Sequence, residues 1–160
     1  MKRYLYVLLP LLIVTALTAV SCSDDSNNSS AKQQDSAGML TALNIIDNVG
    51  FHEIDEELNQ PGGGTIDPSW LGKVRHAQIA VASVEWPGAL RDRAGAFLEA
   101  AERLATTLDA DDAKAGAGPA KDGHETSHDL TTDGWNVLAT RAGIQLPDAE
   151  ETPQASPAGR

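Results

Sequence analysis

The chain has 160 residues, with 12 Lys and Arg against 23 Asp and Glu, so its formal net charge is −11 at pH 7. A surface this acidic repels phosphate groups, which argues against nucleic acid as a partner and against electrostatic docking on anionic lipid. The length is enough for one small domain and too short for two.

Residues 1–21 have the organisation of a secretory signal peptide. Lys2 and Arg3 make a positive start, an apolar stretch covers residues 4–20, and small residues precede Cys22. This order is typical of an export signal that is removed from the mature protein. Two alternatives stay open. One is an ordinary signal peptide cut near Cys22, and the other is an uncleaved anchor, because the apolar stretch is at the lower limit for spanning a bilayer.

The residues around the expected cleavage site carry a more specific signal. The order Ala19-Val20-Ser21-Cys22 resembles the lipobox of bacterial lipoproteins, although that family most often has Leu where Ala19 stands. The resemblance covers residues 1–22 only. It implies that Cys22 is lipidated on its sulfur, for example with palmitate, becomes the new N-terminus, and anchors the domain on the extracytoplasmic side of a bacterial membrane. Inner and outer membrane both stay open.

Two features of the mature chain agree with a lipid anchor. Cys22 is the only cysteine, so no internal disulfide can form, and a free thiol in an exported protein would be a liability. Loss of Lys2 and Arg3 with the signal peptide changes the formal charge from −11 to −13. The lipid alone would therefore hold the protein at an anionic membrane.

Polar segments flank the expected domain on both sides. Residues 22–36 contain almost no apolar side chain, and residues 147–160 are rich in Pro, Ala and small polar residues. Such segments bury too little apolar surface to offset the entropy cost of ordering. We expect a flexible tether at 22–36, a helical domain at 37–146 and a disordered tail at 147–160.

The first helix is predicted by its apolar periodicity. Between residues 39 and 58 the apolar side chains recur at three- and four-residue steps, interrupted at Gly50. The glycine either rephases one helix or caps its C-terminus, in which case a short second segment covers residues 52–59.

The next two helices have clear boundary signals. Asp67-Pro68 provides an N-cap carboxylate and a proline at the first helical position, and Trp86-Pro87 ends that helix. From Leu90 to Leu108 the apolar residues alternate in four- and three-residue spacing, which predicts the following helix.

The last part of the chain combines an expected linker with an expected helix. Residues 109–123 are rich in Ala, Gly and charged residues and contain no large apolar side chain, so we expect a flexible linker there. Leu130, Trp135 and Leu138 then predict a final helix that ends at a Gly143 cap.

The predicted fold class is all-α. No stretch alternates with period two over a convincing length, so no sheet is expected. The simplest arrangement is a small antiparallel four-helix bundle in up-down-up-down order, and an irregular helical array is the alternative.

One named motif occurs in the chain. His124-Glu125-Thr126-Ser127-His128 matches the H-E-x-x-H pattern, in which one helical turn brings two imidazoles to a zinc ion and the Glu activates water. The chain has no predicted sheet and no later histidine, and a capping box at residues 126–129 places the motif at or before a helix start. A zinc hydrolase is therefore a remote hypothesis, and no catalytic constellation predicts an enzyme.

The histidines suggest a metal site. In up-down-up-down order all four fall at one pole of the bundle, within roughly 12 Å in depth. Neutral imidazoles suit divalent transition metals such as Zn or Cu, and nearby carboxylates could complete the ligand shell. The candidate ligands are His52, His76, His124 and His128, with carboxylates at Glu53, Asp55, Glu56, Glu125 and Asp129. The opposing interpretation is four solvated histidines, because His52 and His76 lie opposite the apolar stripes of their own helices.

Two functional hypotheses follow. In the first, an envelope lipoprotein without enzymatic activity binds a divalent transition metal at the histidine pole. In the second, the helical domain is an adaptor or structural module whose exposed faces bind another envelope protein, which requires no histidine. Both assume attachment to a membrane through Cys22 and neither involves nucleic acid.

Overall fold

The computed structural model describes residues 25–62 and 64–145. The predictions for the signal peptide at 1–21, for Cys22 and for the tail at 147–160 lie outside the described residues. Within them the chain forms only helices and turns, which confirms the all-α prediction. The five helices are α1 (Asp25–Asp47), α2 (Phe51–Leu58), α3 (Pro68–Ala82), α4 (Gly88–Asp109) and α5 (Ala113–Ala142).

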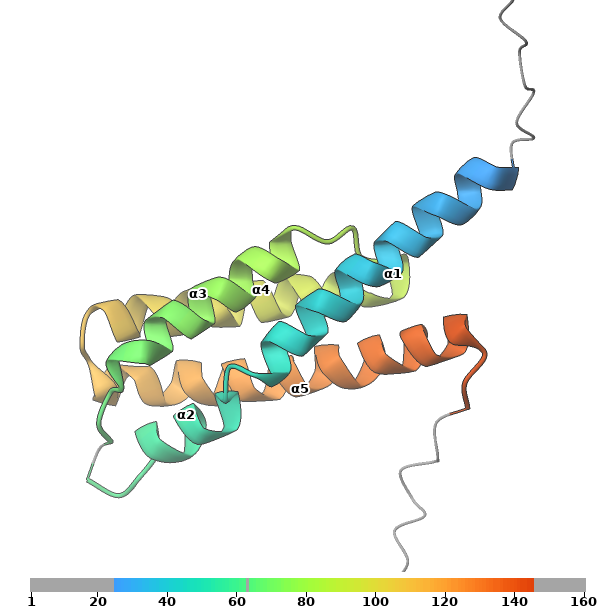
Figure 1. The fold of residues 1–160 in the computed structure, drawn as a ribbon. Helices are drawn as coiled ribbons and strands as arrows, with labels where there is room; N and C mark the ends of the chain where they lie inside the picture. The colour runs from blue at the N-terminus through green and yellow to red at the C-terminus, as the bar shows by residue number, and fades with distance from the viewer. Residues whose placement is uncertain (1–24, 63, 146–160) are drawn as a thin grey trace, which may run out of the picture.

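The helices pack as a bundle (Figure 1). α4 lies between α3 and α5 and contacts both, α1 crosses over α3 and α5, and α2 packs on α5. The core contains an edge-to-face contact between Phe51 and Phe97, with ring centroids 5.5 Å apart and an angle of 87° between the planes. Such aromatic pairs add about 0.5–1.5 kcal/mol to the stabilisation from burial alone. This contact ties the short α2 to α4.

Gly50 separates α1 from α2. It adopts a left-handed conformation with φ 82° and ψ 43°, which side chains with a Cβ disfavour. Its carbonyl oxygen accepts the first hydrogen bond of α2 from the backbone N–H of Ile54 at 3.1 Å. Of the two alternatives for this glycine, the structure has the one with a short second segment, α2, and the chain changes direction at Gly50 so that α2 packs on α5.

α3 begins where the sequence predicts but ends at Ala82, before the predicted stop at Trp86-Pro87, and α4 covers the predicted stripe from Leu90 to Leu108. The Asp67 carboxylate accepts a hydrogen bond of 2.7 Å from the backbone N–H of Ser69, and this contact lowers the pKa of Asp67 below its ordinary value. At the other end, the buried Trp86 indole donates to the carbonyl oxygen of Val81 at 2.9 Å and closes the turn into α4. The start signal at Asp67-Pro68 therefore acts as expected.

The expected linker at 109–123 is wrong. α4 extends to Asp109 and α5 begins at Ala113, where the Asp112 side chain caps the new helix by accepting from the backbone N–H of Ala115 at 2.9 Å. Only three residues, 110–112, connect the two helices.

Small residues explain why this segment packs without large apolar side chains of its own. Gly116, Ala120 and Gly123 are buried on the inner face of α5. A Cβ built on Gly123 would lie 3.4 Å from the Phe51 ring, and one built on Gly116 would lie 3.1 Å from Leu58. The large side chains of α2 therefore fill the space that the small residues of α5 leave open.

The expected tether is also partly wrong, because α1 begins at Asp25 and residues 25–36 continue the helix. Extending an existing helix costs much less than nucleating one, and the packed residues from Met39 onward supply the nucleus. Arg141 of α5 adds a hydrogen bond of 3.1 Å to the Ser36 hydroxyl. None of the described helices is long and apolar enough to cross a membrane.

Candidate functional site

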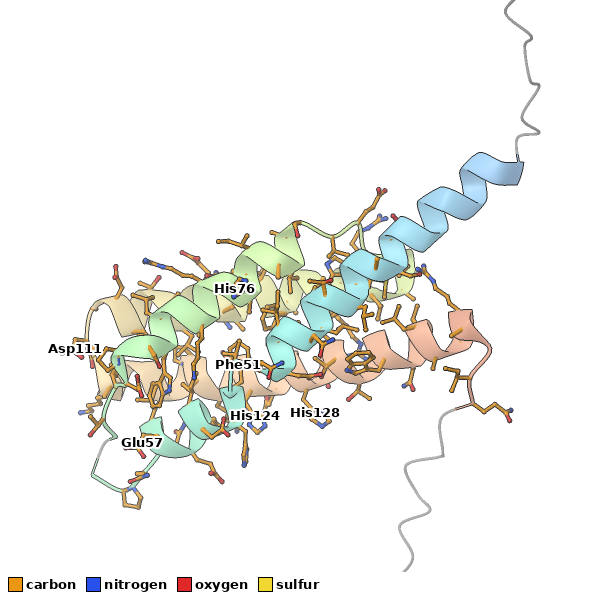
Figure 2. All side chains as sticks on the ribbon, viewed as in Figure 1. Phe51, Glu57, His76, Asp111, His124 and His128 are labelled. Atoms are coloured by element: carbon orange, nitrogen blue, oxygen red, sulfur yellow. The ribbon has the colours of Figure 1, made fainter. Side chains whose placement is uncertain are left out.

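The H-E-x-x-H residues lie well inside α5, not at or before a helix start as expected (Figure 2). The helix is already capped at Asp112, so the expected capping box at 126–129 is not used. Instead the Thr126 hydroxyl donates to the carbonyl oxygen of Asp122 at 2.7 Å, as side chains in a continuous helix do. The motif is helical, but its Glu125 forms an exposed ion pair with Lys121 at 3.8 Å.

His124 points toward α2. Its Nδ1 lies 2.9 Å from a carboxylate oxygen of Asp55, and 31% of the His124 side chain is exposed. In Figure 2, His124 lies beside Phe51, where the start of α2 meets α5. The packing of Phe51 into the core therefore positions the neighbouring His52 close to His124.

His52 and His124 form the only close imidazole contact in the described part of the chain. Their ring centroids are 4.9 Å apart and the rings are tilted by 59°. His52 also contacts Glu56 one helical turn later, with Nε2 3.2 Å from the carboxylate oxygen, and 63% of the His52 side chain is exposed. We call His52 and His124, with their carboxylate partners Asp55 and Glu56, the His52–His124 pair.

The carboxylates determine which nitrogen of each ring is available in the neutral form. A carboxylate only accepts hydrogen bonds, so it selects the tautomer with the proton on the nitrogen that it contacts. Nδ1 of His124 and Nε2 of His52 then carry the protons, and Nε2 of His124 and Nδ1 of His52 keep a lone pair. Histidines that bind metals have this arrangement, with one nitrogen on the metal and the other on a carboxylate or carbonyl.

The structure does not gather all four histidines at one pole. His76 is exposed on α3 and lies between α3 and α1, whereas His128 is exposed one turn beyond His124 on α5 (Figure 2). Among residues 25–62 and 64–145, no group of three or more His, Cys, Asp or Glu side chains is placed to hold a metal ion. The reason is the turn at Gly50, which carries His52 to α5 and away from α3.

The other expected carboxylates have separate roles. Asp129 forms a 2.9 Å ion pair with Arg93 of α4, and Glu53 is exposed in the first turn of α2. Of the carboxylates named from the sequence, only Asp55 and Glu56 contact histidines in the described residues.

A second feature, which the sequence did not predict, is an open groove between α1 and α3. Its volume is ≈ 450 Å³. Apolar, amide and hydroxyl side chains line one wall, and two basic side chains lie on the other. The lining residues are Thr41, Asn44, Ile45, Asn48, Val49, Lys73 and His76. No spacing in the sequence distinguishes these residues from an ordinary helix surface.

Comparisons of the chain with protein-family models, with curated proteins and with solved structures found no match. What the protein does is therefore inferred from its own residues.

Proposed function

We propose that this chain is a lipid-anchored protein of the bacterial cell envelope whose helical domain binds a divalent transition metal at the His52–His124 pair. The lipobox order that ends at Cys22 supports the anchor. One observation carries the metal proposal: two imidazoles from different helices lie 4.9 Å apart, and each has a carboxylate on one nitrogen.

The ring separation suits two ligands of one metal ion. Zinc–nitrogen bonds are about 2.0–2.1 Å, so the centres of two rings on a tetrahedral zinc lie roughly 5 Å apart. The observed 4.9 Å needs little rearrangement of the helices. Because 63% of the His52 side chain is exposed, its ring has room to adjust toward a shared ligand.

The chemistry of the pair favours zinc or copper. Imidazole ligands suit both metals, and the Irving–Williams order places Cu²⁺ above Zn²⁺ in affinity. The carboxylates of Asp55 and Glu56 make the imidazoles better electron donors and hold their orientation. The net charge of the chain, −11, also raises the local concentration of cations.

Calorimetric titration of the chain with Zn²⁺ and with Cu²⁺, without a histidine tag, tests this function. We expect saturable binding that is lost in His52→Ala and in His124→Ala. His76→Ala is the matched control, because it removes an exposed histidine on a different helix. Full binding in the double variant His52→Ala, His124→Ala would refute the site.

The alternative function, an adaptor for another envelope protein, has support from the groove between α1 and α3. Lys73 and His76 are basic side chains in a strongly acidic protein, and the exposed apolar residues Leu40 and Ile79 belong to the same two helices. These features suit an acidic segment of a partner with apolar side chains.

Crosslinking in membranes tests the adaptor function. The Lys73→Glu variant should lose the crosslinked partner and Lys114→Glu should keep it, whereas equal crosslinking in both would count against the adaptor.

The direction of neighbouring helices in the bundle is a separate proposal. We infer that neighbouring helices run in opposite directions, in up-down order, with α1 and α2 together in the place of the first helix. Two ion pairs between α4 and α5 support this, because Arg103 contacts Asp122 and Arg93 contacts Asp129. The residue number rises along one helix as it falls along the other. Distance measurements between spin labels on α4 and α5 would test the order.

A further inference from the structure

We propose that two copies of this chain share one metal ion. The His52–His124 pair of each copy supplies two imidazoles, and the two pairs together form a four-histidine shell around the metal. This inference rests on the proposed function and specifies its stoichiometry and its partner.

The first argument is that one copy provides too few ligands. Zinc in structural sites is almost always bound by four ligands in a tetrahedron. In the described residues no group of three or more candidate side chains can hold a metal. Asp55 and Glu56 already contact the imidazoles, and Glu125 contacts Lys121. The pair therefore supplies half of a tetrahedral shell.

The second argument is that the pair is accessible to another macromolecule. His52 is 63% exposed and His124 is 31% exposed, and the neighbouring Glu56 and His128 are exposed as well. A metal bound at this position would lie at the surface where α2 meets α5 (Figure 2). The exposed side of the pair is therefore open to a second copy.

The third argument is symmetry. When two identical pairs approach a metal on a two-fold axis, each contributes the same two ligands, and the assembly closes as a dimer. No further residue is needed to complete the shell. Lipid anchors would favour this encounter, because they confine the copies to one surface and raise their effective concentration. A two-fold axis perpendicular to the membrane keeps both anchors on the same side.

The fourth argument is the charge around the pair. α2 carries Glu53, Asp55, Glu56 and Glu57 within eight residues, and its only basic side chain is His52. Two copies of this surface repel each other in the absence of a cation. A divalent cation between them offsets part of that repulsion while it binds the imidazoles. The dimer should therefore form only with metal.

The experiment is a zinc titration of the full chain, purified from membranes in detergent without a tag. Light scattering after size-exclusion chromatography measures the protein mass, and elemental analysis measures the zinc content. We expect a monomer without zinc and a dimer with one zinc per two chains, which a chelator returns to monomer. His52→Ala and His124→Ala should each abolish the dimer, and His76→Ala should leave it unchanged.

Several outcomes would overturn the inference. A monomer with one zinc per chain would refute the shared metal and leave the proposed function intact. A chain that binds no zinc would refute both. A dimer that forms without zinc, or that survives in His52→Ala, would refute the metal bridge. X-ray absorption at the zinc edge gives an independent measurement on the unmodified chain: four histidine ligands support the shared site, and two refute it.

Discussion

Asp55 and His124 are 69 positions apart in the chain, yet a carboxylate oxygen of Asp55 lies 2.9 Å from Nδ1 of His124. Their contact links α2 to α5 at the surface where His52 is also located. Asp55 is held from the other side by the Asn59 amide, which donates to its carboxylate at 2.8 Å. The carboxylate is therefore well placed to orient the His124 ring.

Removing the Asp55 carboxylate should weaken metal binding more than it weakens the fold. We expect Asp55→Ala to lower zinc affinity by about 10- to 100-fold, as is typical when a carboxylate behind a histidine ligand is lost. Asp55→Asn should lose less, because its amide oxygen still accepts the hydrogen bond. Calorimetry measures the affinity, and Asp122→Asn, whose carboxylate pairs with Arg103, is the control. Equal affinity in Asp55→Ala and the unmodified chain would contradict this role.

Substitution of Gly50 should destabilise the fold through backbone strain. Its φ of 82° lies in the left-handed region, where a residue with a Cβ costs about 1–2 kcal/mol more than glycine. We therefore expect Gly50→Ala to lower the free energy of unfolding by about that amount. Urea denaturation measures it, with Gly95→Ala on α4 as the control, because a Cβ there meets nothing within 4 Å. An unchanged midpoint in Gly50→Ala would contradict the left-handed conformation.

The sequence was sufficient for features that depend on neighbouring residues. The cap at Asp67 arises from local backbone chemistry and occurs as predicted, and the break at Gly50 is one of the two alternatives that the sequence left open. The contact between His52 and Glu56 also follows from their spacing of four residues on a helix.

Features that depend on distant residues were not predictable in the same way. The start of α5 lacks large apolar residues, and it packs because Phe51 and Leu58 of α2 fill the space beside Gly123 and Gly116. The contact of Asp55 with His124 likewise requires α2 to lie on α5. In up-down-up-down order His76 has nearly the same depth along the bundle axis as the other histidines, but depth does not determine which side of a helix faces which neighbour.

The cap at Asp67 should make stability depend on pH in the acid range. Its backbone contact with Ser69 lowers the pKa below the ordinary value of 3.8. When the pKa of a carboxyl is lower in the folded state than in the unfolded state, the carboxyl contributes its full stabilisation at pH values above the unfolded-state pKa. This contribution is lost as the pH falls through the folded-state pKa. Asp67→Asn keeps the cap, because Asn caps helices about as well as Asp.

We expect thermal melts at pH 7 to show a decrease of a few degrees for Asp67→Ala and little change for Asp67→Asn. As the pH falls through the lowered pKa of Asp67, the difference between the unmodified chain and Asp67→Ala should shrink, because the carboxyl is then protonated in both the folded and the unfolded state. A difference that grows on acidification would contradict the sign of the pKa change.

Gly134 of α5 lies directly against a core side chain of α1. A Cβ built there would lie 2.7 Å from one methyl carbon of Leu43 and 2.8 Å from the other, and Leu43 is fully buried. The buried Leu43 side chain must shift to admit the new Cβ, so Gly134→Ala disturbs the packing between α1 and α5. Such overpacking costs about 1–3 kcal/mol, of which the better helix propensity of Ala recovers about 1 kcal/mol.

The matched control is Gly72→Ala on α3, an exposed helical glycine whose new Cβ would meet nothing within 4 Å. It gains helix propensity without a clash, so we expect it to raise the free energy of unfolding by about 0.5–1 kcal/mol. The two identical substitutions should therefore move the urea midpoint in opposite directions. We also expect the double variant Gly134→Ala, Leu43→Ala to lose less unfolding free energy than the sum of the losses in the two single variants. Such a difference shows that the two residues are in contact as described. A loss in the double variant equal to that sum would mean that the two residues are not in contact.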